Sequence, residues 1–216
     1  MAKITDKCHI GFSSKYYDKL QLKAISEDRM CIMIIYLHVQ FLNTSLSDNI
    51  FNDLGIDINK LIECIDNQKD IALIFDLTTD LDVLSVNNIP IPIENINRVS
   101  DYTRHRLFTI SNIFSDRQFT YICDSIVKSG AKRCTITTTS QTIYFQYMGD
   151  DGKFYSDVYD TTSDVEASVA SYPIEYLTLV TDHDLVLMHI KPHYPLFLYS
   201  PLRSCAGNVE IIIHPY

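Results

Sequence analysis

Runs of apolar residues and stretches of strict alternation predict a chain built mainly from β-strands. Residues 31–41 are rich in Ile, Val, Tyr and Phe, whereas residues 135–147 alternate, first with Ile136 and Thr138 on one side and then with Ile143, Phe145 and Tyr147 on one side. Residues 149–152 (Gly-Asp-Asp-Gly) are typical of a turn, so residues 153–159 are expected to return as the partner strand. Further strands are predicted over residues 8–12, 71–75, 82–86, 107–111, 185–190, 196–199 and 209–213.

Helical spacing is rarer and predicts four short helices. The clearest covers residues 115–129, because Ser115 can serve as N-cap, Gln118 holds the capping-box position and Gly130 follows. Its expected buried face comprises Phe119, Ile122, Cys123, Ile126 and Val127. The other helices are predicted over residues 59–66, 172–180 and 13–24, the first with Ile58, Leu61, Ile62 and Ile65 on one face.

The order of these elements repeats along the chain. A strand and a helix begin each half, several strands follow, and a second helix precedes the last strands. Ile58-Asn59-Lys60-Leu61-Ile62 before residues 70–73 parallels Ile174-Glu175-Tyr176-Leu177-Thr178 before residues 184–187. We therefore expect an α+β chain of two similar domains, residues 1–93 and 107–216, joined by a polar connector at residues 94–106. Each domain is expected to carry two short helices on one face of an antiparallel sheet.

Composition narrows the class of protein. The 216 residues include 18 Lys or Arg and 27 Asp or Glu, for a formal net charge of −9, and 46% are hydrophobic. Such a chain can bury a core, and its acidic balance disfavours a surface that grips nucleic acid everywhere, although a basic stripe remains compatible with it. Only 6 Gly occur, without a phosphate-binding loop motif, and none of the 6 Cys forms a CxxC pair. We expect free buried cysteines and an intracellular, soluble chain with no membrane segment.

Candidate catalytic chemistry is weak. Asp182, His183, Asp184, His189 and His193 lie near one another in sequence, but their spacing fits no standard zinc motif. Cys123 could pair with a distant His as a nucleophile, yet it lies on the predicted buried face of a helix. We expect no catalysis, no cofactor and no bound metal. A metal-dependent hydrolase using the His cluster remains the least favoured alternative.

The order of the segments and their amino-acid sequences resemble those of a sliding DNA clamp of the proliferating cell nuclear antigen (PCNA) family. Phe119-Thr120-Tyr121-Ile122-Cys123-Asp124-Ser125-Ile126 resembles the opening helix of the family's second domain. Ile143-Tyr144-Phe145 with Gly149 and Gly152 is similar to the strand, turn and strand that follow. Residues 195–198 (Pro-Leu-Phe-Leu), Gly207 and the ending Ile211-Ile212-Ile213-His214-Pro215 resemble the closing strands. The chain is shorter than the family norm, mainly before Gly55 and around residues 161–175.

The resemblance implies a processivity factor rather than an enzyme. It implies a homotrimeric ring that encircles double-stranded DNA without sequence preference and tethers DNA polymerase and other replication or repair proteins that carry PCNA-interacting peptides. A clamp loader is implied as a further partner, and the nucleus, or the site of viral DNA replication, as the location. The shortened first half keeps two alternatives open: a subunit of a hetero-oligomeric checkpoint ring, and a monomeric polymerase accessory factor.

The resemblance also implies roles for particular residues. Family helices line the DNA hole, so basic residues on or beside the predicted helices are candidate DNA contacts, and a helix over residues 13–24 would align the first three in one stripe. They are Lys15, Lys19, Lys23, Lys60, Lys69, Arg117, Lys128, Lys132 and Arg133. The implied pocket for partner peptides comprises Val99, Tyr102, Pro195, Ile212, Ile213, His214 and Pro215. Subunits would pair through sheet edges, with residues 135–139 and 153–159 as candidates in the second domain.

Overall fold

The computed structural model divides the chain into two compact units. It describes residues 4–12, 19–38, 54–65, 73–75, 83–86, 88–95, 112–162, 165–180, 185–202 and 207–216. The first unit comprises Met1–Arg29 and Met33–Asp101, and the second comprises Met30–Ile32 and Tyr102–Tyr216. The predicted connector at residues 94–106 lies almost wholly outside the described residues, so its boundaries stay a prediction. No helix among the described residues is long and apolar enough to span a membrane.

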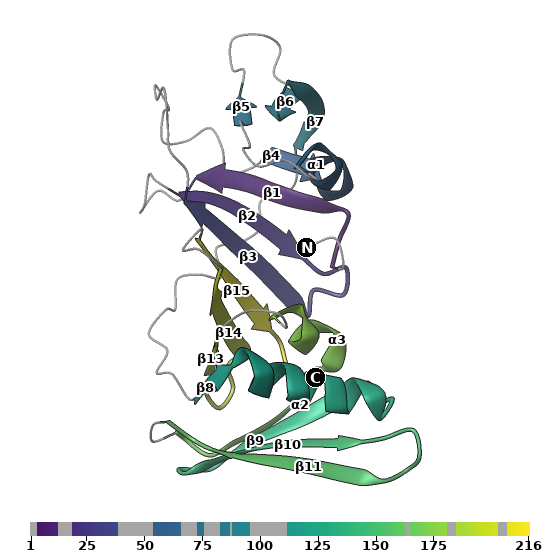
Figure 1. Ribbon diagram of the computed structural model, residues 1–216, viewed down its shortest axis with the longest axis vertical. Coiled ribbons are helices and arrows are strands. Elements are labelled where there is room, and N and C mark those ends of the chain that lie inside the picture. The colour runs from purple at the N-terminus through teal and green to yellow at the C-terminus, as the bar shows by residue number, and fades with distance from the viewer. Residues whose placement is uncertain are drawn as a thin grey trace. The chain divides into compact units, whose positions relative to one another are not determined.

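The first unit is an antiparallel sheet with one described helix (Figure 1). Its strands follow one another across the sheet in the order β5-β6-β7-β4-β1-β2-β3. Helix α1 places Leu61 and Cys64 against Cys8 and Ile10 of β1 and the alternate residues of β2, so that helix and sheet share one apolar core. The elements are β1 (Lys7–Phe12), β2 (Lys19–Ile25), β3 (Cys31–His38), β4 (Leu54–Asp57), α1 (Ile58–Ile65), β5 (Leu73–Phe75), β6 (Val83–Val86) and β7 (Ile89–Asn95).

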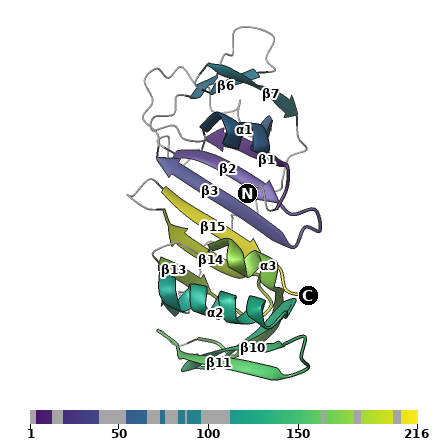
Figure 2. The same ribbon diagram turned by 45° about the vertical axis from the view of Figure 1, so that its right-hand side comes forward.

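The second unit has two four-stranded groups and the longest described helix. The strand order is β15-β14-β13-β8 in one group and β11-β10-β9-β12 in the other. Figures 1 and 2 show α2 and α3 on one side of these strands. The elements are β8 (Asn112–Ser115), α2 (Asp116–Lys128), β9 (Arg133–Thr138), β10 (Thr142–Met148), β11 (Phe154–Asp160), β12 (Ser168–Pro173), α3 (Ile174–Leu177), the 3-10 turn η2 (Thr178–Val180), β13 (Leu185–His189), β14 (Leu196–Pro201) and β15 (Gly207–Ile213).

Helix α2 forms where the sequence predicts it, for the predicted reason. The Ser115 hydroxyl accepts from the backbone N–H of Gln118, and the Gln118 side chain accepts from the backbone N–H of Ser115 at 3.1 Å, which completes a capping box. Phe119, Ile122, Cys123 and Ile126 are buried. Phe119 lies against Phe114 of β8, whose ring in turn contacts Phe145 and Tyr159. One aromatic core therefore joins the helix to both strand groups of this unit.

The structure confirms most predicted elements and corrects several. The predicted helix over residues 13–24 is wrong from Lys19 onward, because residues 19–25 form β2; residues 13–18 lie outside the described residues. Val127 and Ile62, predicted to be buried, are 54% and 44% exposed. The third helix begins at Ile174 because residues 168–173 continue as β12. The strand predicted over residues 107–111 lies outside the described residues, which show β8 at Asn112–Ser115 instead.

The predicted internal repeat is present with a different alignment at its start. Strands β1 to β4, helix α1 and strands β5 to β7 correspond in order to β9 to β12, the α3–η2 turn and β13 to β15. The sheet order β4-β1-β2-β3 likewise matches β12-β9-β10-β11. Strand β1 therefore corresponds to β9, and the described part of the first unit contains no counterpart of β8 and α2. Of the two helices expected in each domain, the described first unit shows only α1.

Candidate nucleic-acid interface and partner surface

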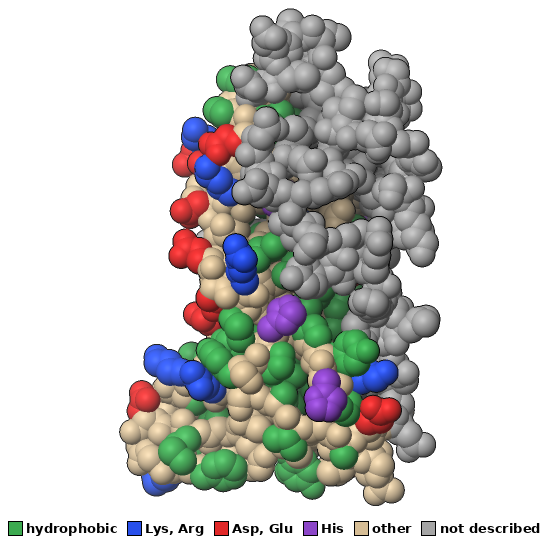
Figure 3. Space-filling model, turned by 180° about the vertical axis from the view of Figure 1, so that it is seen from behind, with side chains coloured by type: hydrophobic (Ala, Val, Ile, Leu, Met, Phe, Trp, Pro, Cys, Tyr) green, Lys and Arg blue, Asp and Glu red, His purple; other side chains and the backbone are tan. Residues whose placement is uncertain are grey.

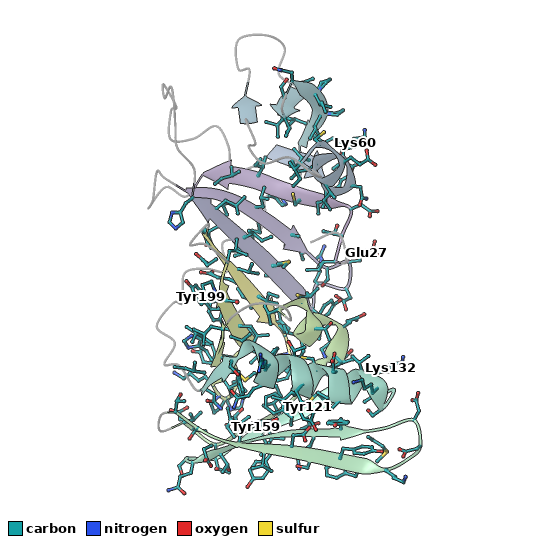
Figure 4. All side chains as sticks on the ribbon, viewed as in Figure 1. Glu27, Lys60, Tyr121, Lys132, Tyr159 and Tyr199 are labelled. Carbon is teal, nitrogen blue, oxygen red and sulfur yellow. The ribbon has the colours of Figure 1, made fainter. Side chains whose placement is uncertain are left out.

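The exposed side of α2 carries a stripe of basic, aromatic and acidic side chains, which we call the α2 stripe. Arg117, Tyr121, Asp124 and Lys128 are all exposed and recur at three- and four-residue spacing, opposite the buried face of the helix. Figure 4 labels Tyr121 on α2 and Tyr159 on β11. Burial, followed by the nearby Asp157 and Tyr121, raises the pKa of the Tyr159 hydroxyl. The α2 stripe thus offers two cations, separated by one aromatic residue and one carboxylate.

The other described helices are less basic than α2. Helix α1 exposes Asn59, Lys60, Ile62 and Glu63, and Figure 4 labels Lys60 there. The only charged residue of α3 is Glu175, which is exposed. Among the described exposed side chains of α1, α2 and α3, three cations accompany three carboxylates. The cations are Lys60, Arg117 and Lys128, and the carboxylates are Glu63, Asp124 and Glu175.

The predicted stripe of Lys15, Lys19 and Lys23 does not form as a helical face. Lys19 and Lys23 lie on β2, and Lys15 is outside the described residues, as is Lys69. Leu22 and Ala24 belong to the core that α1 shares. Because neighbouring residues of a strand point to opposite faces, Lys23 lies on the sheet face away from α1, where it is only 9% exposed. Helix-based spacing therefore misassigned Lys23 to the helix side.

Lys132 and Arg133 follow α2, as predicted, but they differ in surroundings. Both side chains are exposed, and Figure 4 labels Lys132 just beyond the end of the helix. Arg133 is the first residue of β9, next to Cys134, which is fully buried on the core side. Alternation directs Arg133 to the opposite face, where its guanidinium carbon lies 3.8 Å from the centre of the Tyr216 ring. Arg133 therefore contacts the segment that follows β15, residues 214–216, which we call the tail, rather than extending the α2 stripe.

A second surface lies on the face of strands β8, β13, β14 and β15 that is turned away from Phe114 and α2. We call it the distal face. The register places Ile113, Leu187 and Tyr199 in one row across three strands, and His189, Phe197 and Ile212 in the next. Ile113 is exposed, Leu187, His189 and Tyr199 are half-buried, and the remaining two are nearly buried. Figure 3 shows hydrophobic and His side chains side by side in the lower part of the molecule, on the side opposite the viewer of Figure 1.

One ring contact and one tyrosine–carboxylate pair lie on the distal face. The His189 and Phe197 rings meet edge to face, with centroids 5.3 Å apart. Tyr199 lies opposite Glu210 of β15, whose side chain is buried. Burial, with a smaller contribution from the Glu210 carboxylate, raises the pKa of the Tyr199 hydroxyl, which keeps it a neutral donor. The distal face is thus apolar, with a few fixed polar groups.

The predicted pocket residues divide between this surface and the core. Ile212 lies on the distal face, and Pro195 is half-buried just before β14. Ile213 pairs with Leu196 on the core face and is fully buried, so it cannot line an exposed pocket. His214 and Pro215 are half-buried in the tail, while Val99 and Tyr102 lie outside the described residues. Leu187, His189 and Tyr199 were missed, although alternation in the predicted strands 185–190 and 196–199 could have placed them beside Ile212.

Comparison with known proteins identifies the fold. No protein-family model and no curated protein sequence matches the chain. Proliferating cellular nuclear antigen from Entamoeba histolytica matches with a TM-score of 0.76 at 15% identity, over 99% of this chain and 91% of that one. The PCNA2–PCNA3 complex from Sulfolobus tokodaii matches with a TM-score of 0.72 at 16% identity, over 99% and 92%. PCNA from Thermococcus kodakaraensis matches with 0.72 at 15%, over 100% and 92%. The chain has the fold of a PCNA sliding clamp.

The clamp fold of this chain leaves two end strands, β11 and β12, in one described strand group of the second unit. Strand β11 ends the group β11-β10-β9-β12, whereas β9 lies between β10 and β12. Residues 135–139 were predicted as an edge candidate, and this is wrong for residues 135–138, because β9 is paired on both sides. In the first unit, β7 is likewise paired on both sides, with β6 and with β4.

The clamp fold here shows no assembled metal centre in its described part. No group of three or more His, Cys, Asp or Glu side chains that could hold a metal lies together among the described residues. Asp182, His183 and Asp184 lie outside them, whereas His189 belongs to the distal face. Cys123 is buried, and its burial raises the pKa of the thiol to about 12, which keeps it protonated rather than nucleophilic. Cys8, Cys31, Cys64, Cys123 and Cys134 are free and buried.

Proposed function

We propose that this chain is a sliding-clamp processivity factor that encircles duplex DNA and tethers DNA polymerase and other replication or repair proteins. The observation that carries the proposal is the PCNA fold, which extends over 99–100% of the chain. The two compact units with corresponding strand orders support it, since a ring needs repeated, similarly curved units. In this role the chain has no catalytic step and needs no cofactor.

DNA contact is assigned to the helix side, with α2 as its main contributor. Arg117 and Lys128 flank Tyr121 on the exposed stripe, and Lys60 and Lys132 supply further exposed cations. Such side chains attract phosphates without reading base edges, which suits movement along any sequence. Asp124, Glu63 and Glu175 on the same helices keep the attraction weak. The balanced charge thus supports loose enclosure rather than tight binding.

The salt dependence of DNA binding tests this assignment. Each phosphate contact contributes about 0.9 to the slope of log affinity against log salt, so the double variant Arg117→Ala/Lys128→Ala should lose up to about 1.8 of that slope. Lys191→Ala removes an exposed cation outside the helices and serves as control. The measurement is fluorescence anisotropy on duplex DNA of unrelated sequences across a salt series. An unchanged slope in the double variant would refute DNA contact through α2.

Partner capture is assigned to the distal face. Partner peptides of clamps insert aromatic and aliphatic anchors into an apolar groove. Leu187, His189, Tyr199 and Ile212 supply an apolar surface with polar tips, and the tail residues His214 and Pro215 follow directly from β15. DNA polymerase, other proteins with PCNA-interacting peptides and a clamp loader are the proposed partners. The proposed location is the nucleus, or the site of viral DNA replication if the chain is viral.

The proposed assembly is a homotrimeric ring joined through the edge of β11. Strand β11 exposes Phe154 and Val158 on one side of its open edge. A second candidate is a ring of unlike subunits. Strand β7, the counterpart of β15, is paired with both β6 and β4, so it offers no edge to β11 of a second copy, and the strand that β11 meets would then belong to a different chain. The matched structure from Sulfolobus tokodaii is a complex of PCNA2 with PCNA3. Solution mass separates the two candidates.

A further inference from the structure

The three residues after β15 run from one strand group of the second unit to the other. Strand β15 ends at Ile213, where it pairs with Leu196 of β14. Only three residues later, the backbone N–H of Tyr216 donates to the carbonyl of Ser171 at 3.1 Å. Ser171 belongs to β12, the end strand of the other group. The tail, residues 214–216, therefore joins the β15 side to the outer edge of β12.

Arg133 holds the aromatic end of this tail. Its guanidinium carbon lies 3.8 Å from the centre of the Tyr216 ring, within the range in which a cation and a ring attract. Arg133 pairs across β9 and β12 with Pro173, and Thr135 pairs with Ser171, so Arg133 and the carbonyl that Tyr216 binds lie two residues apart on paired strands. The Thr135 and Ser171 hydroxyls are themselves hydrogen-bonded at 2.6 Å. The tail thus meets an ordered strand pair rather than an isolated side chain.

We infer that Arg133 and Tyr216 form a latch that fixes the end of the tail across the edge of β12. Together with the hydrogen bond from the backbone N–H of His214 to the carbonyl of Met30, at 2.8 Å, this latch positions His214 and Pro215. The same contact covers part of an open strand edge, which would otherwise invite pairing with another chain. Arg133 is therefore a positioning residue for the partner surface and not a DNA contact. The second part of this inference, the effect on partner binding, rests on the proposed function; the latch itself does not.

A single-tryptophan reporter tests the latch directly. The sequence contains no Trp, so Tyr216→Trp introduces one indole, and Trp is the ring that cations bind best. Adding Arg133→Ala should shift the latched-to-open ratio of the tail by about two- to five-fold toward the open form, as expected for an exposed cation–ring contact. Acrylamide, a neutral quencher, should then quench the indole more strongly. Lys132→Ala removes the neighbouring exposed cation and should leave quenching unchanged, whereas Arg133→Lys should give an intermediate value. Equal quenching in the Arg133→Ala and Lys132→Ala proteins would overturn the latch.

The binding of a peptide to the full chain tests whether the latch affects the partner surface. The probe is a labelled synthetic peptide with one helical turn bearing two aromatic anchors and one aliphatic anchor. Arg133→Ala should weaken its binding by at most about five-fold, in proportion to the fall in the latched fraction of the tail, while Lys132→Ala should not weaken it. Equal binding by the Arg133→Ala and unsubstituted chains would refute positioning by the latch. Absence of binding by the unsubstituted chain would instead refute the partner-surface assignment, with the latch still decided by quenching.

Discussion

At the residue scale, the turn after α2 depends on a glycine whose backbone no other residue adopts easily. Gly130 has φ of +78°, and a Cβ at this position would collide with the Asp150 carboxyl. Gly152, in the turn between β10 and β11, has φ of +75° but nothing within 4 Å of its would-be Cβ. The two positions therefore separate the backbone cost of a side chain from the cost of crowding.

Alanine substitution at these glycines should give unequal losses of stability. Gly152→Ala should lower the free energy of unfolding by about 1–2 kcal/mol, the cost of the left-handed backbone alone. Gly130→Ala should cost slightly more, because the exposed Asp150 carboxyl must turn aside, and adding Asp150→Ala should bring the loss back toward that of Gly152→Ala. Urea unfolding followed by circular dichroism measures all three. Equal losses for the two single variants would show that Asp150 exerts no crowding.

Buried thiols make the second unit sensitive to alkali. Burial raises the pKa of the Cys123 and Cys134 thiols from 9.0 to about 12. Below pH 9 both the folded and unfolded chains keep these protons, so the full stability is present. Between pH 9 and 12 the unfolded chain loses them first, and the free energy of unfolding should fall as the pH rises.

The urea midpoint at pH 8 and at pH 10.5 checks this expectation. The unsubstituted chain should unfold at a lower urea concentration at the higher pH, and Cys123→Ala/Cys134→Ala should show a smaller drop. If the double variant lost as much as the unsubstituted chain, other groups would be responsible for the alkaline loss.

At the scale of helices and strands, the sequence predicted an element most accurately where its capping residues, apolar periodicity and terminating residues all indicated the same structure. Helix α2 has a cap, a periodic apolar face and a terminating glycine, and it forms within one residue of the predicted ends. The segment 19–25 carried two competing periods. Lys15, Lys19 and Lys23 suggested a helix, but Leu20, Leu22 and Ala24 alternate, and burial of these three against α1 decided for a strand.

The start of the third helix was also mispredicted because pairing with a strand decided the structure. Tyr172 and Pro173 were predicted to start the third helix, yet pairing of Tyr172 with Cys134 and of Pro173 with Arg133 keeps them in β12. A cross-strand partner far away in sequence leaves no local signal. The edge or interior position of β9 could not be predicted for the same reason.

The cap of α2 gives a direct test at this scale. Ser115→Ala should lower the free energy of unfolding by about 1 kcal/mol, because it removes the acceptor for the Gln118 backbone N–H. Ser115→Asp keeps an acceptor and should remain close to the unsubstituted chain. Thermal unfolding of the three proteins provides the comparison, and equal losses for Ala and Asp would contradict a capping role.

At the scale of the whole molecule, the order of the segments along the sequence was enough to predict the fold. The identity of single residues predicted the DNA-contact and partner-binding sites less well. The resemblance to PCNA rested on α2, the β10–β11 turn and the closing strands, and the match to PCNA structures covers the entire chain. Of the proposed DNA contacts, Lys23 and Arg133 lie on sheet faces away from the helices. Charge alone could not show this, because the direction of a side chain depends on which element it belongs to and on what its neighbours bury.

The net charge of −9 has a clearer meaning once these positions are known. Among the described exposed residues of the helices, cations and carboxylates are equal in number, so this part of the surface is not strongly basic. If the chain is the proposed clamp, its retention on DNA comes chiefly from enclosure, and enclosure requires several chains. The proposed function therefore depends on the claim that several copies of the chain assemble into a ring.

Solution mass, measured by sedimentation equilibrium over a range of concentrations, tests that claim most directly. We expect a species of three times the 24.8 kDa chain mass. The double variant Phe154→Lys/Val158→Lys on the β11 edge should dissociate this species. The control Val169→Lys lies on the opposite end strand β12 and should leave the species intact, although all three side chains are more than half exposed. A mass of one chain at every concentration would contradict the homotrimeric ring.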